Sequence, residues 1–358
     1  MKQEEELANQ ANWRVLLALS ALIAGAAVML ACTGNGGTSS AGLAQPVFSN
    51  YHLTGATAPV HDPSIFRQGE TYYVFGTDVG APLSGSLPIR CSTDRVSWIQ
   101  CGYVFTQVPT WVTIDVPGIV GLWAPDISYF GGVYHAYYAG STFGSNTSVI
   151  GLATNVTLDA SDPNYEWIDR GKVLGSTFTD DFNAIDPTIL ADTDGRVWMT
   201  YGSFWTGIKQ REINPATGML LASNPTIYSL AERPAVQFDP IEGTSLVHKG
   251  NFYYLFASFD FCCKPNPYDD TYRIVVGRAT SPNGPFADMN GSPMMQGGGT
   301  ELLAGNRETY SGPGGETVYL DSQNGDLIVF HAIHLPDGQA YLFVNPLTWS
   351  NDWPQIQP

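Results

Sequence analysis

One pattern recurs five times along the chain and limits what it can fold into. Each copy has an acidic or Gly/Pro corner, an alternating strand, a turn that contains glycine, and a second, apolar strand that is aromatic-rich in most copies. The copies are "HDPSIFRQGETYYVFGTD", "APDISYFGGVYHAYYAGS", "IDPTILADTDGRVWMTYGSF", "EGTSLVHKGNFYYLFASFD" and "GPGGETVYLDSQNGDLIVFHA". Each copy is predicted to form a β-hairpin.

The spacing of the copies predicts the architecture. A weaker second hairpin follows, for example in "PIRCSTDRVSWIQCGYVF", "SVIGLATNVTLDASDPNYEWIDRGKVL" and "YRIVVGRATSPNGPFAD", so each repeat is expected to hold four strands. The corner residues are 64, 60, 56 and 70 positions apart: Asp62, Asp126, Asp186, Glu242 and Gly312. This period suits a propeller blade with long loops. The prediction is an all-β fold, a five-bladed β-propeller over residues 49–358, without a long amphipathic helix.

Composition agrees with a turn-rich β protein and narrows the choice of partners. The chain has 38 Gly and 24 Pro, and only 14% of its residues are charged. Acidic side chains outnumber basic ones by 33 to 16, which gives a net charge of −17, and no run of Lys and Arg forms a locally basic segment. Nucleic acid and anionic membrane surfaces are therefore not expected as partners.

The N-terminus predicts export. Residues 1–31 are interpreted as a signal peptide with an apolar run over Val15–Ala31, and residues 32–48 as a flexible linker. The stretch "MLAC", which ends at Cys32, resembles a bacterial lipobox and suggests a lipid anchor in the outer membrane. A cleaved signal of a secreted protein and an uncleaved anchor are the alternatives, and all three place the domain outside the cytoplasm.

Four further cysteines allow three pairings. Cys91 and Cys101 flank a turn, where adjacent antiparallel strands could bring them together. Cys262 and Cys263 are neighbours, so they form either a vicinal disulfide or two free thiols. No CxxC spacing occurs, which speaks against a structural zinc site.

The recurring acids indicate chemistry. Equivalent corners of a propeller converge at one end of its axis, which would gather Asp62, Asp126, Asp186 and Glu242. Clustered carboxylates repel one another unless one is protonated, and a protonated acid beside an ionised one is what a glycoside hydrolase requires. The alternative is that each acid only caps a turn. We prefer this alternative for Asp126, which follows its proline instead of preceding one.

Several motifs carry a family resemblance. "HDPS", "WAPDI", "STFGSNTSVIGLAT", "NAIDP", "YGSFWTGI", "EGTSL" and "SFDFCC" occur in this order between residues 51 and 354, and the chain thereby resembles the family 43 glycoside hydrolases, in particular the arabinanases that cut α-1,5-linked L-arabinan. The resemblance implies that Asp62 is the general base, that Asp186 tunes the pKa of the acid and orients the sugar, and that Glu242 is the general acid. It also implies inversion, with the base and the acid about 6.5–9.5 Å apart.

Substrate contacts are expected from aromatic and polar side chains near these acids. Trp123 and Phe143 are candidates for stacking on sugar rings, although either could be a core aromatic. Asn183 and Ser203 are candidates for hydrogen bonds to sugar hydroxyls, although either could hold a loop. His61 is a further candidate, and its alternative is a hydrogen bond within the protein.

A metal is implied by the resemblance. In the resembling arabinanases, a histidine at the place of His331 lies near the axis and helps to hold a hydrated cation, usually calcium. Calcium prefers oxygen donors, so water would complete its coordination. Two departures from the family pattern fall in blade five: Gly315 stands where many relatives have histidine, and Ile333 where an aromatic residue is usual. No organic cofactor is expected.

The leading hypothesis is a monomeric, exported endo-arabinanase. The endo mode is inferred from "STFGSNTS" and "GSFWTGI", which resemble the endo-arabinanase pattern. An exo-acting α-L-arabinofuranosidase or β-xylosidase of the same fold is the alternative among enzymes. A glycan-binding propeller without catalysis is the alternative outside them, and it predicts that one of the acids would be replaced.

Overall fold

The computed structural model describes residues 52–79 and 85–357. The predicted signal peptide, residues 1–31, and the whole predicted linker, residues 32–48, lie outside this range. Sheet one contains β1 (Thr54–Gly55), β2 (Ser64–Gln68), β3 (Thr71–Phe75), β4 (Ser86–Ser92) and β5 (Ser97–Phe105). Sheet two contains β6 (Leu122–Phe130), β7 (Val133–Gly140), β8 (Ser148–Asn155) and β9 (Ile168–Ser176).

Sheet three contains β10 (Thr188–Ala191), β11 (Val197–Tyr201), β12 (Ile208–Ile213) and β13 (Tyr228–Ala231). Sheet four contains β14 (Ile241–Lys249), β15 (Phe252–Phe259), β16 (Arg273–Ala279) and β17 (Thr300–Ala304). Sheet five contains β18 (Tyr310–Tyr319), β19 (Leu327–His334), β20 (Ala340–Ser350) and β21 (Trp353–Ile356). The helices are short: α2 (Thr110–Asp115), η1 (Pro267–Asp269) and η2 (Met294–Gln296).

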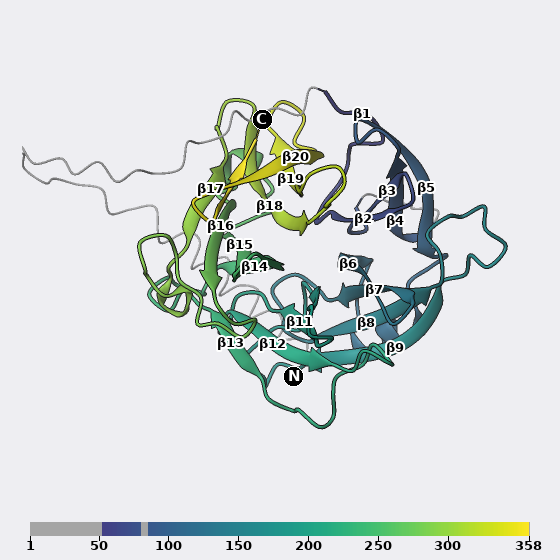
Figure 1. The fold of residues 1–358 in the computed structure, drawn as a ribbon, viewed down its shortest axis with the longest axis horizontal. Coiled ribbons are helices and arrows are strands. Elements are labelled where there is room, and N and C mark those ends of the chain that lie inside the picture. The colour runs from purple at the N-terminus through teal and green to yellow at the C-terminus, as the bar shows by residue number, and fades with distance from the viewer. Residues whose placement is uncertain (1–51, 80–84, 358) are drawn as a thin grey trace, which may run out of the picture. The chain divides into compact units, whose positions relative to one another are not determined.

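The five sheets are the blades of a propeller, as predicted. Figure 1 shows them around a common centre, from purple in blade one to yellow in blade five. The first strand of each blade contacts the first strand of the next, and β18 contacts β2, which closes the ring. Each predicted opening hairpin is present as the first two strands of its blade.

Apolar side chains from neighbouring blades form the core. Five clusters of buried residues each draw on two adjacent blades, one cluster per interface. Phe75 and Tyr138, for example, belong to the cluster between blades one and two, and Phe256 and Phe330 to the cluster between blades four and five. Strands that are covered on both faces are expected to be almost continuously apolar, as in "TYYVF" of β3.

Two details differ from the prediction. Blade one has a fifth strand, because β1 pairs in parallel with β5. The stretch "PFAD", residues 285–288, is not the fourth strand of blade four; Ala287 makes isolated bridges to Arg278 and Pro293, and β17 takes that place. Pro282 and Pro285 have no N–H to donate to a ladder, so pairing stops before the turn.

The cysteines of the described residues form two disulfides. Cys91 and Cys101 join β4 to β5, which are adjacent antiparallel strands. Cys262 and Cys263 form a vicinal disulfide just after β15. Within residues 52–79 and 85–357, no helix has both the length and the apolar character needed to cross a membrane.

Candidate active site

Three of the recurring acids meet at one end of the innermost strands. Asp62 precedes β2, Asp186 precedes β10, and Glu242 lies at the start of β14. Their charges interact: Glu242 and Asp62 both raise the pKa of Asp186, and Asp62 raises the pKa of Glu242. The structure therefore gathers three carboxyls that lie far apart in the sequence, at positions 62, 186 and 242.

Asp126 does not join this group, and the alignment of the corners explains why. Each blade begins with a residue in the left-handed backbone region, and four of these residues precede a proline: Asp62 (φ 47°), Ala124 (φ 41°), Asp186 (φ 54°), Gly243 (φ 57°) and Gly312 (φ 56°). The expectation that all four acids occupy equivalent corners was therefore wrong. Ala124 is the equivalent of Asp62 in blade two, and Glu242 stands one position earlier than its corner.

Asp126 instead connects blades two and three. Its Oδ1 accepts a hydrogen bond from Thr188 Oγ1 at 3.4 Å, and Ile189 donates its backbone N–H to the carboxyl. The side chain is buried, and burial raises its pKa to about 7. Its place in the fold favours a structural role.

Asp62 is held by three neighbours. Thr77 donates its hydroxyl to Asp62 Oδ2 at 2.5 Å, and the backbone N–H of Asp62 donates to His331 Nδ1 at 3.1 Å. Gly315 packs against both, since a Cβ at residue 315 would clash with Asp62 Oδ1 and His331 Nδ1. Burial raises the pKa of Asp62, whereas the charge of His61 and the Thr77 hydrogen bond lower it.

Glu242 is held by two hydroxyls. Ser203 Oγ lies 2.5 Å from Glu242 Oε2, and Tyr272 Oη lies 2.9 Å from Glu242 Oε1. A hydroxyl can donate to a carboxylate or accept from a carboxylic acid, so both contacts suit either protonation state. Burial is the largest cause that raises the pKa of Glu242, and the two hydroxyls lower it.

Asp186 completes the group of acids. Gly243 donates its backbone N–H to Asp186 Oδ2 at 3.1 Å. Burial and then the charges of Glu242 and Asp62 hold the pKa of Asp186 well above its usual range. Each ionised carboxyl opposes ionisation of the others, so the three titrate as a coupled group. Once the first has ionised, the remaining carboxyls hold their protons more tightly.

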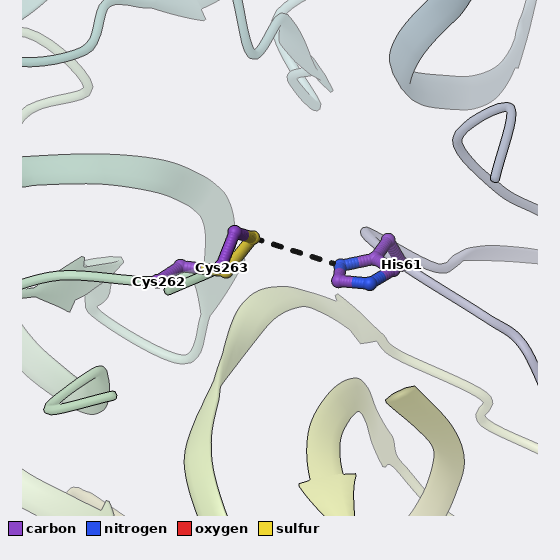
Figure 2. Close-up of side chains that lie close together, drawn as sticks. All are labelled: His61, Cys262 and Cys263. Carbon is purple, nitrogen blue, oxygen red and sulfur yellow. Dashed lines mark hydrogen bonds between the residues drawn. A yellow bond between two sulfur atoms is a disulfide. The ribbon is translucent and has the colours of Figure 1, made fainter. Parts of the chain in front are cut away.

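Two imidazoles and the vicinal disulfide lie beside Asp62. The ring centroids of His61 and His331 are 4.5 Å apart. Cys262 Sγ lies 3.6 Å from His331 Nε2, and Cys263 Sγ lies 3.9 Å from His61 Nδ1, the contact drawn in Figure 2. A cavity of about 670 Å³ is lined by His61 and Cys263 and, further along, by Tyr268 and Pro336.

The predicted substrate contacts fall into two groups. Trp123 and Phe143 are ring neighbours with centroids 5.0 Å apart, and 84% of Phe143 is exposed, so it is not a core aromatic. Asn183 and Ser203 are buried and engaged within the protein: Asn183 Oδ1 accepts from Ser148 Oγ at 2.7 Å, and Ser203 bonds Glu242. Contact of any of the four with substrate stays a prediction.

Comparison with known proteins decides the family. The sequence model of Glycosyl hydrolases family 43 matches residues 56–354. The chain belongs to glycosyl hydrolase family 43. It is 38% identical over 297 residues to the extracellular endo-alpha-(1->5)-L-arabinanase 1 of Bacillus subtilis, covering 82% of this chain and 87% of that protein.

Two further proteins are similar to this chain over most of their length. The extracellular exo-alpha-(1->5)-L-arabinofuranosidase ArbA of Cellvibrio japonicus is 39% identical over 310 residues, which cover 83% of this chain and 86% of that protein. The structure of the Cellvibrio cellulosa alpha-L-arabinanase complexed with arabinohexaose superposes with a TM-score of 0.77 at 38% identity, covering 84% of this chain and 96% of that chain.

The calcium ion expected from the family resemblance can be tested against His331. This side chain is fully buried, and burial followed by the charge of His61 lowers its pKa well below the usual value, so the ring is neutral. A neutral imidazole has one acceptor nitrogen, and here Nδ1 accepts the Asp62 N–H. We therefore assign the proton to Nε2, and His331 in this arrangement does not fit as a direct ligand of a cation.

Several side chains that contact the three acids were not predicted from the sequence of this family 43 member. Thr77 and Tyr272 hold two of the acids, and neither was singled out. A usable signal exists for the hydroxyl residues, because one follows the second strand in three blades, at Thr77, Ser141 and Ser203. In blade four the corresponding Ser258 is the second-last residue of that strand. Tyr272 lies outside this repeat, and only the folded chain places it beside Glu242.

Glu316, on β18 of blade five, is another buried acid, and it was not among the predicted site residues. Its side chain is 2% exposed, and Oε2 accepts from Ser258 Oγ at 2.7 Å, whereas Oε1 has no hydrogen-bond partner. Burial raises its pKa to about 8, and the charge of Asp62 adds to this. Glu316 is accordingly protonated at neutral pH.

The variant Glu316→Gln is expected to flatten the dependence of stability on pH. Because the folded pKa is raised from 4.5 to about 8, the proton on Glu316 stabilises the fold fully below pH 4.5, and this contribution falls as pH rises towards 8. The wild type should lose up to ~1.4 kcal/mol per pH unit that the variant does not lose. Urea unfolding at several pH values measures the difference, and parallel profiles would contradict the prediction.

Proposed function

We propose that this chain is an exported endo-α-1,5-L-arabinanase that hydrolyses internal arabinofuranosidic bonds with inversion. The observation that carries the proposal is the group of Asp62, Asp186 and Glu242, whose charges oppose one another at one end of the innermost strands. Family 43 membership and the similarity to a relative named as an endo-arabinanase support the substrate and the mode of cleavage.

In the proposed mechanism, two carboxyls act on opposite sides of the glycosidic bond. Glu242 donates its proton to the leaving oxygen as the bond to the anomeric carbon breaks. Asp62 accepts a proton from the water whose oxygen attacks that carbon from the other face. Charge on Asp62 favours the protonated form of Glu242, and Asp186 is proposed to orient the sugar and to tune the acid. Proton exchange with solvent restores both groups.

Features on several blades support an open groove. Trp123 and Phe143 offer an aromatic surface on blade two. The cavity beside His61 reaches the loop after β15 and the turn after β19, in blades four and five. Contacts available on more than one blade suit a polymer that extends beyond the bond to be cut, which is the requirement of endo cleavage.

The decisive experiment is a time course of product sizes from the purified protein on linear α-1,5-arabinan. Mixed oligosaccharides at early times are the expected result. Arabinose alone from the start would indicate the exo mode, which the similar Cellvibrio japonicus enzyme has by name. An absence of products would contradict the proposal and favour another glycan or binding without catalysis.

Phe143→Ala is expected to weaken binding of arabinan and to leave folding unchanged. Phe143 is 84% exposed, so its removal leaves no cavity, and loss of one stacking contact of ~0.5–1.5 kcal/mol should raise KM roughly 2- to 10-fold with kcat retained. Initial rates over a range of arabinan concentrations measure this. The matched control is Ile99→Ala, an exposed apolar side chain on β5, the fourth strand of blade one, and an equal KM change in both variants would refute the assignment.

The remaining expectations stay predictions. Export is supported by the relatives named as extracellular, and a lipid anchor at Cys32 rests on the lipobox resemblance alone. The calcium ion likewise rests on resemblance, the monomeric state stays a prediction, and no step of the proposed mechanism passes through a metal.

A further inference from the structure

The vicinal disulfide and its two imidazole neighbours form a cluster that the proposed mechanism leaves largely unused. Cys263 Sγ lies 3.9 Å from His61 Nδ1, and Cys262 Sγ lies 3.6 Å from His331 Nε2. Cys263 is exposed and lines the cavity together with His61, so small molecules can reach the disulfide. Figure 2 shows the His61 ring facing the two sulfurs.

The donor atoms of this cluster suit a soft cation once the sulfurs are reduced. A ring nitrogen of His61 and both sulfurs lie within 4.8 Å of one another. A thiolate sulfur and an imidazole nitrogen on the same tetrahedral zinc are roughly 3.6 Å apart, as follows from Zn–S and Zn–N bonds of about 2.3 and 2.0–2.1 Å. The observed 3.9 Å between Cys263 Sγ and His61 Nδ1 is close to that separation.

The surroundings favour this chemistry on two counts. Thiolates select zinc and similar soft cations over calcium, which prefers oxygen donors. His331, whose Nδ1 accepts the Asp62 N–H, directs its Nε2–H toward Cys262 Sγ and can donate to a thiolate there. Such a hydrogen bond would orient the sulfur as a second-layer partner of a bound cation.

We propose that reduction of the Cys262–Cys263 disulfide creates a binding site for one thiophilic divalent cation of the zinc class, with Cys262, Cys263 and His61 as ligands. Two molecules of a small thiol reduce the protein disulfide. Their two hydrogens end on Cys262 and Cys263 as thiols, and the two small molecules leave joined as a disulfide. The cation then displaces two protons from the thiols, and water takes the fourth position. Because His61 adjoins Asp62, the loaded site blocks the candidate base, and cleavage becomes sensitive to thiols and soft metal together.

Cadmium binding provides the test. The full-length chain with Cys32→Ser, kept in detergent, is reduced with a trialkylphosphine, which takes oxygen from water to become the phosphine oxide and leaves two thiols. After removal of the reductant, Cd²⁺ is titrated and the ultraviolet thiolate-to-cadmium charge-transfer band is recorded. We expect the band to saturate at one Cd²⁺ per chain more than in the variant Cys262→Ser/Cys263→Ser after the same reduction, and we expect zinc to displace the cadmium. The unreduced protein should show no band.

Variants assign the ligands. Cys262→Ser/Cys263→Ser is the matched control, because it keeps the Cys91–Cys101 pair and so reports any cadmium bound there after the same reduction. His61→Gln keeps both thiols and should weaken Cd²⁺ binding by at least about 10-fold. Cys262→Ser alone has no vicinal disulfide, so its thermal unfolding shows directly whether the fold tolerates the open form.

The proposal is overturned by any of three results: an equal band in the unreduced protein, an equal band in the double serine variant, or unchanged affinity in His61→Gln. Failure of the single variant to fold would also overturn it, since the reduced site could not then exist in the native protein. Cadmium uptake is measured without substrate, so its outcome is separate from that of the proposed arabinanase activity. With active enzyme, Cd²⁺ should inhibit only the reduced form, and a chelator should restore the rate.

Discussion

Glu242→Gln is expected to abolish cleavage of α-1,5-arabinan while binding of arabino-oligosaccharides is retained. The amide keeps the shape of the side chain and its contacts with the hydroxyls of Ser203 and Tyr272, but it cannot deliver a proton to the leaving oxygen. General acid catalysis contributes about 10²–10⁴-fold, so kcat should fall by at least roughly 100-fold. Initial rates on linear arabinan and calorimetric binding of oligosaccharides measure the two effects.

The control for Glu242→Gln is Asp126→Asn, another buried acid changed to its amide outside the group of three acids. Its rate per folded molecule should equal that of the wild type, and any loss should appear in stability, because Asp126 accepts bonds from blade three. Retention by Glu242→Gln of more than a few per cent of the rate would show that another group is the acid. A clean loss of rate in Asp126→Asn at unchanged stability would show that its role is chemical.

Asp62→Asn is expected to remove the base and to lower kcat by about 10²–10⁴-fold. The amide oxygen can still accept from Thr77, and the backbone N–H of residue 62 can still donate to His331, so the fold should persist. Thermal unfolding of the variant checks this. The substitution leaves Glu242 able to protonate the leaving group but leaves no acceptor for the proton of the attacking water.

Substrates with different leaving groups separate the two roles. An arabino-oligosaccharide that carries a nitrophenyl group needs no proton on departure, so it should restore much of the rate of Glu242→Gln. The same substrate should not help Asp62→Asn, since activation of water is still missing. Recovery in Asp62→Asn and none in Glu242→Gln would exchange the assignments of acid and base.

The fold was predictable because the blades repeat a local pattern. Each opening hairpin combines a glycine-containing turn with apolar alternation, and these signals act over a few residues. The misplaced fourth strand of blade four shows the limit of such signals. Residues 285–288 resemble a strand, but β17, further along the chain, completes the sheet.

The site was predictable where a motif coincided with a corner. Asp62 and Asp186 precede prolines at the left-handed start of their blades, and the structure brings both to Glu242. Asp126 shows that an acid two residues past its corner, on β6, faces a neighbouring blade instead. The order of the acid and the proline already set Asp126 apart in the sequence, and the left-handed conformation at Ala124 agrees with that offset.

The amino-acid sequence alone was enough for the number of blades, the order of the strands in the opening hairpins and the identity of the three acids, because repeats and corner motifs are local. Only the tertiary structure could decide which side chains meet. Tyr272 reaches Glu242 from the loop just before β16, Gly315 packs against Asp62 and His331, and Cys263 faces His61 across 202 residues of sequence. The contact of Tyr272 forms within blade four, whereas those of Gly315 with Asp62 and of Cys263 with His61 depend on closure of the ring, which no short stretch of sequence encodes.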